Sequence, residues 1–425
     1  LSSDCAVNLE RLKGCGTAVC EVCSSFSMPA LGSDTVIVDA LFGSGLNKPV
    51  EDSVFVAVIN GINASGCKVL SVDMPSGLPG ECGSLTSGVA VRATDTFTLQ
   101  FPKLSLLMPE NECYVGDMKI VDISLSKEGI DKISSDLFFL DEKDINELLR
   151  PRAKHAHKGC FGHALLVAGS RGMAGASVLA ARAALRSGVG LLTVHLPMCN
   201  NDIVQAAVPE AMTSIDSNET CFSDPVSTEK YSAVAVGPGI GTDKKSEKAL
   251  LQLIDSCRVP MVVDADALNI IARNPHYLSR LPKGSIITPH PGEFARLFGK
   301  KDRYSSINSV RSLARDYGIV IVLKGAYTTI IAPDGNLYFN STGNSGMATA
   351  GSGDVLSGVL LSLMAQGYKA TDAALMGVYV HGLAGDCAAE TKGVVSLVAS
   401  DIVDSLPEAF KALEKVNSCC RCNNR

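Results

Sequence analysis

The chain lacks an excess of positive charge and any long apolar run. Its 425 residues carry 38 basic and 44 acidic side chains, a formal net charge of −6, which gives no electrostatic reason to expect a nucleic acid partner. No segment approaches the roughly 18 uninterrupted apolar residues that span a bilayer, so no membrane association is predicted. Residues 1–30 show no basic segment followed by an apolar one, so we expect no signal peptide and a cytoplasmic protein.

The sequence also lacks a recognisable metal-binding arrangement of cysteines. Its 15 cysteines are scattered, which favours reduced thiols in a chain of this size over a disulfide framework. Cys20 and Cys23 form one cluster, and Cys419, Cys420 and Cys422 form another. A zinc site would need a second pair or a nearby histidine. Neither is close in sequence, so a metal or redox role is the less favoured interpretation of both clusters.

Short, continuously apolar runs alternate with helical stretches along the whole chain. Such runs indicate parallel strands covered by helices on both faces, an α/β fold in which ligands bind beyond the carboxyl ends of the strands. Two further runs flank Asp334-Gly335, predicting a hairpin and an antiparallel edge in the second sheet. The predicted strands are residues 35–39, 68–73, 94–99, 164–168, 191–195, 233–236, 261–264, 319–323, 328–332 and 336–339.

The boundary between domains is predicted near residues 126–160. Residues 126–150 are charged and helical in pattern, and residues 151–158 form a basic, turn-rich connector. No internal repeat or low-complexity tract is present. We therefore expect a first domain over residues 1–125, a helix and linker over 126–160, a second domain over 161–412 and a cysteine-rich tail over 413–425.

A glycine-rich segment, residues 342–354, leads into an apolar helix over residues 355–366, which Gly367 ends. Gly351 and Gly353 carry no Cβ atom, so their backbone N–H groups can approach an anion closely at a helix N-terminus. Asp354, in the first turn, either caps the helix or accepts a proton from a substrate hydroxyl that attacks phosphorus. The glycine-rich approach favours the second interpretation, because phosphoryl transfer depends on positioning and electrostatics.

Several other loops follow predicted strands, and none is a P-loop, because the chain contains no G-x-x-x-x-G-K-[ST] string. Residues 236–241 and 170–176 are loops of small residues suited to a ligand. Residues 288–293 form a proline-fixed turn that bears His290, either a structural histidine or a ligand contact, and we favour the contact. Lys324 closes a buried strand, where it either meets phosphate or extends to solvent.

Taken together, these strings resemble the NAD(P)H-hydrate dehydratase family of nicotinamide-nucleotide repair. The resemblance covers about residues 150–410 and implies a ribokinase-like, three-layer α/β/α domain. It rests on seven segments that occur in the family's order: residues 161–170, 171–176, 236–239, 263–269, 288–293, 323–326 and 343–354.

The first part of the chain is similar to the NAD(P)H-hydrate epimerase domain that precedes the dehydratase in fused proteins. Residues 38–49 and 71–77 carry this similarity. The family's upstream Asn-Asn-Gly-Gly-Asp-Gly string is absent, so residues 1–125 are expected to be a partial Rossmann-like epimerase domain. On this expectation the chain is truncated or its start is misassigned, and its epimerase is inactive.

The resemblance implies that hydrated NADH or NADPH is dehydrated at the expense of ADP or ATP, through a phosphorylated intermediate and with Asp354 as the base. ADP is favoured over ATP, Mg²⁺ is expected to bridge the phosphates, and a homo-oligomer is expected. The main alternative is a vitamin-precursor kinase with the same Gly-x-Gly-Asp helix start. A nucleotide-binding scaffold without turnover is another alternative, and it is stronger for the first domain.

Site residues follow from the resemblance, position by position. The hydrate contacts are Ala176, Gly239, His290 and Asp354. The nucleotide contacts are Lys324, Gly325, Ala326, Tyr327, Thr328 and Gly353. In the epimerase part, the potassium positions are Asp39 and Ser76, and the substrate contacts are Asp73, Gly43, Ser44, Gly45, Leu46, Asn47, Lys48 and Pro49. The competing interpretation is that Asp39 and Asp73 only end strands and cap the loops that follow.

Overall fold

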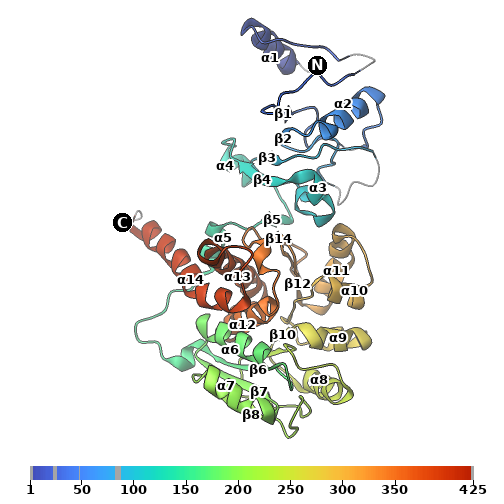
Figure 1. Cartoon of the computed structure of the whole chain (residues 1–425). Helices are drawn as coiled ribbons and strands as arrows, with labels where there is room; N and C mark the ends of the chain where they lie inside the picture. The colour runs from blue at the N-terminus through green and yellow to red at the C-terminus, as the bar shows by residue number, and fades with distance from the viewer. Residues whose placement is uncertain (1–2, 23–25, 47, 82–87, 423–425) are drawn as a thin grey trace. The chain divides into compact units, whose positions relative to one another are not determined.

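The computed structural model describes residues 3–22, 26–46, 48–81 and 88–422, without the side chains of residues 415–422 (Figure 1). It divides into two compact units, Leu1–Lys127 and Glu128–Arg425. Asn47 and Cys23 therefore lie outside the described residues, as do the side chains of the C-terminal cysteines. No helix in the described part of the chain combines the length and apolar character needed to cross a membrane.

The first unit is built on a four-stranded parallel sheet in the order β1-β2-β3-β4. The strands are β1 (Val36–Asp39), β2 (Lys68–Val72), β3 (Asp95–Leu99) and β4 (Asp117–Val121), and the helices are α1 (Ser3–Gly14), α2 (Ser53–Ala64) and α3 (Glu112–Val115). Two short 3₁₀ turns, Leu104–Leu107 and Pro109–Asn111, follow β3. Asp52 caps α2, accepting hydrogen bonds from the N–H groups of Val54 and Phe55.

The second unit contains a ten-stranded mixed sheet in the order β5-β14-β13-β12-β11-β10-β9-β6-β7-β8. The seven strands from β12 to β8 are parallel, while β13 is antiparallel to both of its neighbours. The strands are β5 (Leu137–Phe139), β6 (His163–Val167), β7 (Leu191–Leu196), β8 (Met212–Ile215), β9 (Ala233–Val236), β10 (Met261–Val263), β11 (Ile286–Ile287), β12 (Val320–Leu323), β13 (Thr329–Ile331) and β14 (Leu337–Phe339).

Helices cover both faces of this sheet, as Figure 1 shows. On one face α6, α12, α13 and α14 pack together, and α8 to α11 lie on the other. The helices are α4 (Lys127–Ile130), α5 (Glu142–Leu148), α6 (Ala174–Arg186), α7 (Asn201–Ala207), α8 (Lys244–Ser256), α9 (Ala265–Arg273), α10 (Pro291–Phe298), α11 (Arg303–Tyr317), α12 (Ser352–Ala365), α13 (Ala370–Lys392) and α14 (Ala399–Cys422). This is the three-layer arrangement that the alternating pattern predicts.

The predicted strands are confirmed to within one or two residues, and the predicted hairpin is β13–β14. Four strands were not predicted, namely β4, β5, β8 and β11. β8 carries polar residues between its exposed ends, and β11 is only two residues long. β5 lies inside the segment 126–160, where we predicted a helix and linker. There it pairs with β14, so this segment adds an edge strand and α5 to the second unit.

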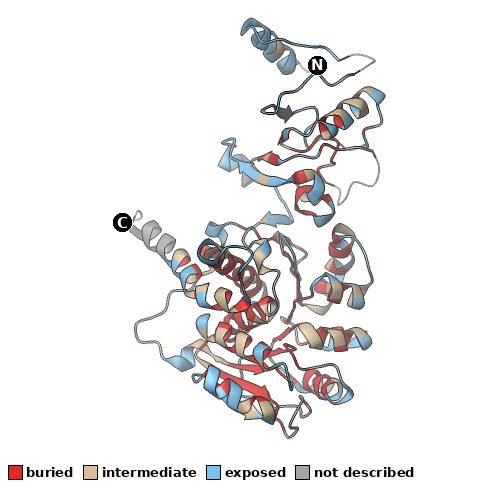
Figure 2. Cartoon of the chain, in the orientation of Figure 1, coloured by how far each residue is buried: buried red, intermediate tan, exposed pale blue. Residues whose placement is uncertain are grey.

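Helix α12 lies at the centre of the second unit. Every residue from Val355 to Ala365 is buried, as Figure 2 shows by colour, and the helix packs against α6, α13, β6, β9 and β10. Its crossing with α6 is close, because a Cβ atom at Gly358 would lie 2.1 Å from the carbonyl oxygen of Ala180. Burial on all sides fixes the start of α12 relative to the carboxyl ends of the strands.

Candidate functional site

The N-terminus of α12 presents Asp354 at the carboxyl edge of the sheet. Gly351 precedes the helix with φ +88°, a left-handed conformation that favours glycine. The Asp354 carboxylate has no hydrogen-bond partner among the residues that the structure describes. Burial raises the pKa of Asp354 to about 6, and the nearby Asp264 carboxylate adds to the rise while Lys324 opposes it. Asp354 is thus poised to accept a proton near neutral pH.

Beside Asp354, the side chains of Asp264, Lys324 and Ser357, from three elements, form a compact network. The Nζ atom of Lys324, at the end of β12, lies 2.7 Å from Oδ1 of Asp264 at the end of β10. Ser357 of α12 donates its hydroxyl to Oδ2 of Asp264 at 2.7 Å. Both oxygens of this buried carboxylate are therefore engaged. A Cβ atom at Gly353 would lie 3.3 Å from Lys324 Nζ, which places the helix start directly beside the ammonium group.

The turn before α10 forms the next wall of this site. His290 caps α10, its Nδ1 atom accepting hydrogen bonds from the N–H groups of Gly292 and Glu293, while Glu293 accepts one from the N–H of His290. Burial raises the pKa of Glu293 to about 7 against the Lys324 ammonium, 3.9 Å away. Burial, with Lys324 and Arg296, lowers the pKa of His290. Neutral His290 therefore carries its proton on Nε2, which lies 3.4 Å from Oε1 of Glu293.

The predicted nucleotide segment, Lys324 to Thr328, is the turn between β12 and β13. The guanidinium group of Arg303, buried beneath it, donates hydrogen bonds to the carbonyl oxygens of Lys324 (3.0 Å) and Leu323 (2.6 Å) and to Thr329 Oγ1 (3.2 Å). Gly325 and Ala326 are exposed at the tip. Arg303 therefore fixes the turn from its buried side. The tip of the turn stays exposed, so its backbone groups can contact a ligand.

On the other side of α12, the loops after β6 and β9 meet. A Cβ atom at Gly239 would lie 3.1 Å from the Cβ atom of Ala176 and 3.0 Å from that of Met173. The N–H group of Gly241 donates to Oδ2 of Asp266, in the first turn of α9, at 2.9 Å. The structure therefore brings Ala176 and Gly239 together in one small-residue wall.

In the first unit, Asp39 is buried at the end of β1. Its Oδ2 atom accepts hydrogen bonds from Ser71 Oγ and from the N–H group of Ser76, both at 2.8 Å. Its Oδ1 atom is buried and has no partner among the described residues. The Ser76 hydroxyl in turn accepts from the N–H group of Phe42 at 2.9 Å. Asp39 and Ser76, predicted together, are direct neighbours.

Asp73 follows β2 with a left-handed φ of +68°. It forms an ion pair with Lys103 and accepts hydrogen bonds from the N–H groups of Leu99 and Ser44. Burial raises the pKa of Asp73, but the hydrogen bond from Lys103 and the two amides outweigh it and lower the value overall. Gly43 also adjoins this carboxylate, since a Cβ atom at Gly43 would lie 3.4 Å from Oδ2 of Asp73.

The rest of the predicted loop in the first unit diverges from Asp73. Gly45 has open space around it, and Leu46 packs against the small core below α2. Lys48 and Pro49 are exposed, and a Cβ atom at Gly88 would lie 3.1 Å from Pro49. Among the described residues of this loop, Gly43 and Ser44 are the ones that adjoin the Asp73 carboxylate.

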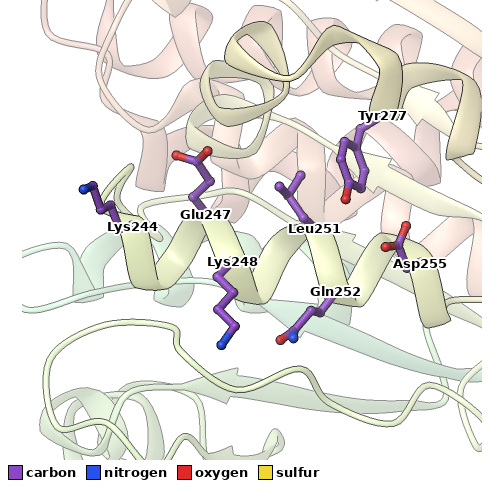
Figure 3. Close-up of a pocket in the computed structure, with 7 residues that line it drawn as sticks. All are labelled: Lys244, Glu247, Lys248, Leu251, Gln252, Asp255 and Tyr277. Carbon is purple, nitrogen blue, oxygen red and sulfur yellow. The ribbon is translucent and has the colours of Figure 1, made fainter.

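A hollow elsewhere on the second unit contains none of the predicted residues. It lies along α8 and is lined by Lys244, Glu247, Lys248, Leu251, Gln252, Asp255 and Tyr277 (Figure 3). Among the described residues, no three His, Cys, Asp or Glu side chains lie together as a protein-held metal site requires. Chemistry is therefore concentrated around Asp354 and, in the first unit, around Asp39 and Asp73.

Both units of the chain match known protein families. Residues 164–408 match the family model for NAD(P)H-hydrate dehydratase, and residues 1–105 match that for the YjeF-related protein N-terminus. A bifunctional NAD(P)H-hydrate repair enzyme of Thermofilum pendens is 38% identical over 423 residues, covering 96% of this chain and 79% of the relative. The chain belongs to the bifunctional NAD(P)H-hydrate repair enzyme family. It is a dehydratase with an attached epimerase domain.

Solved structures agree for the second unit. The ADP/ATP-dependent NAD(P)H-hydrate dehydratase from Bacillus subtilis, co-crystallised with ATP and Mg²⁺, is 30% identical, with a TM-score of 0.59 and coverage of 66% of this chain and 100% of that one. A ribokinase-like superfamily protein from Enterococcus faecalis is 26% identical, with a TM-score of 0.59, covering 66% and 98%. The ribokinase-like fold expected for the dehydratase domain is confirmed.

In this repair enzyme, several residues of the site were not predicted from the sequence. Asp264, Ser357 and Arg303 were missed, as was His381 of α13. The Nε2 atom of His381 lies 3.0 Å from the carbonyl oxygen of Ser352, and burial lowers the pKa of His381 to about 4, so a neutral ring steadies the first turn of α12. For Asp264 a signal existed, namely an acid directly after a buried strand.

Proposed function

We propose that Asp354 is the general base of the dehydratase reaction and that an adenine nucleotide binds at the Lys324–Thr328 turn, with its terminal phosphate between Lys324 and Gly353. The proximity of Gly353 to the Lys324 ammonium supports this placement, because a cation and helix N–H groups converge there. The hydrate binds across the start of α12, against Ala176 and Gly239 on one side and His290 on the side of Lys324. ADP or ATP serves as the phosphoryl donor.

The chemistry follows from this arrangement. The hydroxyl on C6 of the hydrated ring gives its proton to Asp354 while its oxygen attacks the terminal phosphorus, and the shortened nucleotide leaves. The ring nitrogen then expels phosphate from C6, and loss of a proton from C5 restores the dihydropyridine. Phosphate leaves far more easily than hydroxide. The observation that carries this proposal is the Asp354 carboxylate, which has no partner in the described structure and a pKa raised to about 6.

Mg²⁺ fits this site through the nucleotide phosphates. Mg²⁺ typically binds one or two carboxylates together with phosphate oxygens and water, and Asp264 and Glu293 are the carboxylates that flank Lys324. When bound, the ion neutralises charge that develops on the phosphates. His290, as the Nε2–H tautomer, donates a hydrogen bond to the hydrate.

For the epimerase domain we propose a potassium ion held by Asp39 and Ser76. The buried Oδ1 atom of Asp39, which has no partner among the described residues, supports this proposal, because a buried carboxylate oxygen is costly unless a donor or cation meets it. The substrate would bind beside it, against Asp73 and the loop that begins at Gly43. We propose Asn47, outside the described residues, as a further contact in this loop.

The experiment that tests the dehydratase proposal follows the near-ultraviolet absorbance of the dihydronicotinamide ring. Hydrated NADH is mixed with enzyme, Mg²⁺ and either ADP or ATP. Recovery of absorbance together with stoichiometric phosphate release supports repair. A stable phosphoester without recovery of absorbance would instead show a small-molecule kinase.

A further inference from the structure

A second hollow on the dehydratase unit adjoins the proposed hydrate site. Its lining comes from the loops after β6, β8 and β9 and from the start of α8: Ser170, Arg171, Thr220, Cys221, Gly241, Asp243, Lys244 and Lys245. These strands are neighbours in the order β9-β6-β7-β8. Because parallel strands end at the same edge, the loops lie side by side over about 14 Å, at roughly 4.8 Å per strand.

The hollow lies close in sequence and in the sheet to the wall that would hold the hydrated ring. Ser170 and Gly241 line it; Gly239 lies in the same loop as Gly241, and it contacts Ala176 in the first turn of α6, which follows the loop of Ser170. A hydrated dinucleotide extends well beyond the ring that reacts, because the ring is joined through ribose and pyrophosphate to adenosine. The rest of the substrate must leave the ring site, and this hollow lies directly along that side of the sheet.

The charge of the hollow suits phosphate. Arg171, Lys244 and Lys245 line it, against a single lining carboxylate, Asp243. Asp243 is already engaged as the cap of α8, where it accepts hydrogen bonds from the N–H groups of Lys245 and Ser246. Glu219 pairs with Arg171 at 2.7 Å, with both side chains largely exposed. Such an exposed pair is weak and can open for an incoming phosphate.

The outer wall of the hollow is rigidly built. Asp216, buried at the end of β8, accepts hydrogen bonds from the N–H groups of Asn218, Ser223 and Asp224. The carbonyl of Thr220 in this loop accepts a hydrogen bond from the N–H group of Arg171 at 2.8 Å. The loop that carries Thr220 and Cys221 is therefore fixed to the loop that carries the arginine.

From this geometry we infer that the hollow binds a phosphate group of the hydrated dinucleotide, through Arg171, Lys244 and Lys245. The inference rests on the proposed function, since it assigns a seat to the remainder of the same substrate. The shared chemistry is a phosphate ester, either the pyrophosphate bridge or the 2′-phosphate that distinguishes NADPH from NADH.

The test compares steady-state kinetics of the full chain with hydrated NADPH and hydrated NADH, for wild type and for Arg171→Ala/Lys245→Ala. One charged phosphate contact corresponds to about a ten-fold change. A rise in KM of that size for the NADPH hydrate alone assigns the hollow to the 2′-phosphate. An equal rise for both substrates assigns it to the pyrophosphate.

Lys248→Ala is the matched control, because Lys248 lies on the same helix and lines only the other hollow in Figure 3. Its KM should equal that of wild type. Unchanged KM values for both substrates in the double variant would overturn the inference while leaving the dehydratase proposal intact. Failure of the wild type to convert either hydrate would instead refute the proposed function itself.

Discussion

Asp354 in the second unit and Asp73 in the first both lie at the carboxyl end of a parallel sheet, beside a loop of small residues. Lys103 contacts Asp73 directly and, with two amides, lowers its pKa against the effect of burial. In the second unit, Lys324 bonds to Asp264 instead. Burial is the main cause of the raised pKa of Asp354, the Asp264 carboxylate adds to it, and Lys324 opposes it. The two acids therefore differ because the direct hydrogen bonds at Asp73 outweigh burial, whereas at Asp354 burial and a neighbouring carboxylate prevail.

The sharpest way to break this comparison is Asp354→Asn. The variant keeps the shape of the side chain but cannot take a proton, so turnover should fall by about 10³-fold, as expected for loss of a general base. ADP and ATP binding, measured by calorimetry, should remain close to wild type. The control is Asp202→Asn, the same substitution at an exposed acid in the first turn of α7. Wild-type-like turnover in Asp354→Asn would remove this residue from the mechanism.

The pH dependence of dehydration should distinguish Asp354 from Asp73. Asp354 must be ionised to act, and its pKa is raised to about 6, so kcat/KM for dehydration should fall about ten-fold per unit as the pH drops below that value. Asp73, with its pKa lowered, stays ionised over this range.

Glu293 titrates near 7 in the same site, so the profile is repeated with Glu293→Gln. If kcat/KM of this variant still falls as the pH drops below about 6, the group that titrates is Asp354. A fall that disappears with Glu293→Gln would assign the titration to Glu293 and contradict the comparison.

The smallest expected effect concerns the cation of the first unit. Potassium at several times its dissociation constant should stabilise the wild-type chain by about 1 kcal/mol in thermal unfolding, relative to choline at equal ionic strength. Asp39→Asn should abolish this gain, and Asp34→Asn, an exposed neighbour in sequence, should retain it. Equal stabilisation of all three proteins would show that Asp39 holds no potassium.

Much of this organisation could be predicted from the sequence, because continuous apolar strands and glycine-rich turns are local signals. The start of α12 is an example, since Gly351, Gly353 and Asp354 lie within four residues and precede an apolar helix. What could not be predicted depends on contacts between distant segments. Asp264 and Ser357 are 93 residues apart along the chain, and Arg303 is buried only because the β12–β13 turn folds over it.

Edge strands were missed for a related reason. β8 carries polar Thr213 and Ser214 between its ends, so it lacks the continuous apolar run typical of central strands. β5 is apolar but only three residues long, and it lies within a charged segment. β5 is recognisable only through its partner β14, which lies far along the sequence. A charged flanking segment therefore concealed a strand that the second unit uses to complete its sheet.

The close crossing at Gly358 has a consequence for how this enzyme can change. Because the backbones of α12 and α6 are in close contact at this crossing, the distance between Asp354 on α12 and Ala176 on α6 is fixed. A larger residue at 358 would push α12 away from α6 and so increase the distance between Asp354 and Ala176.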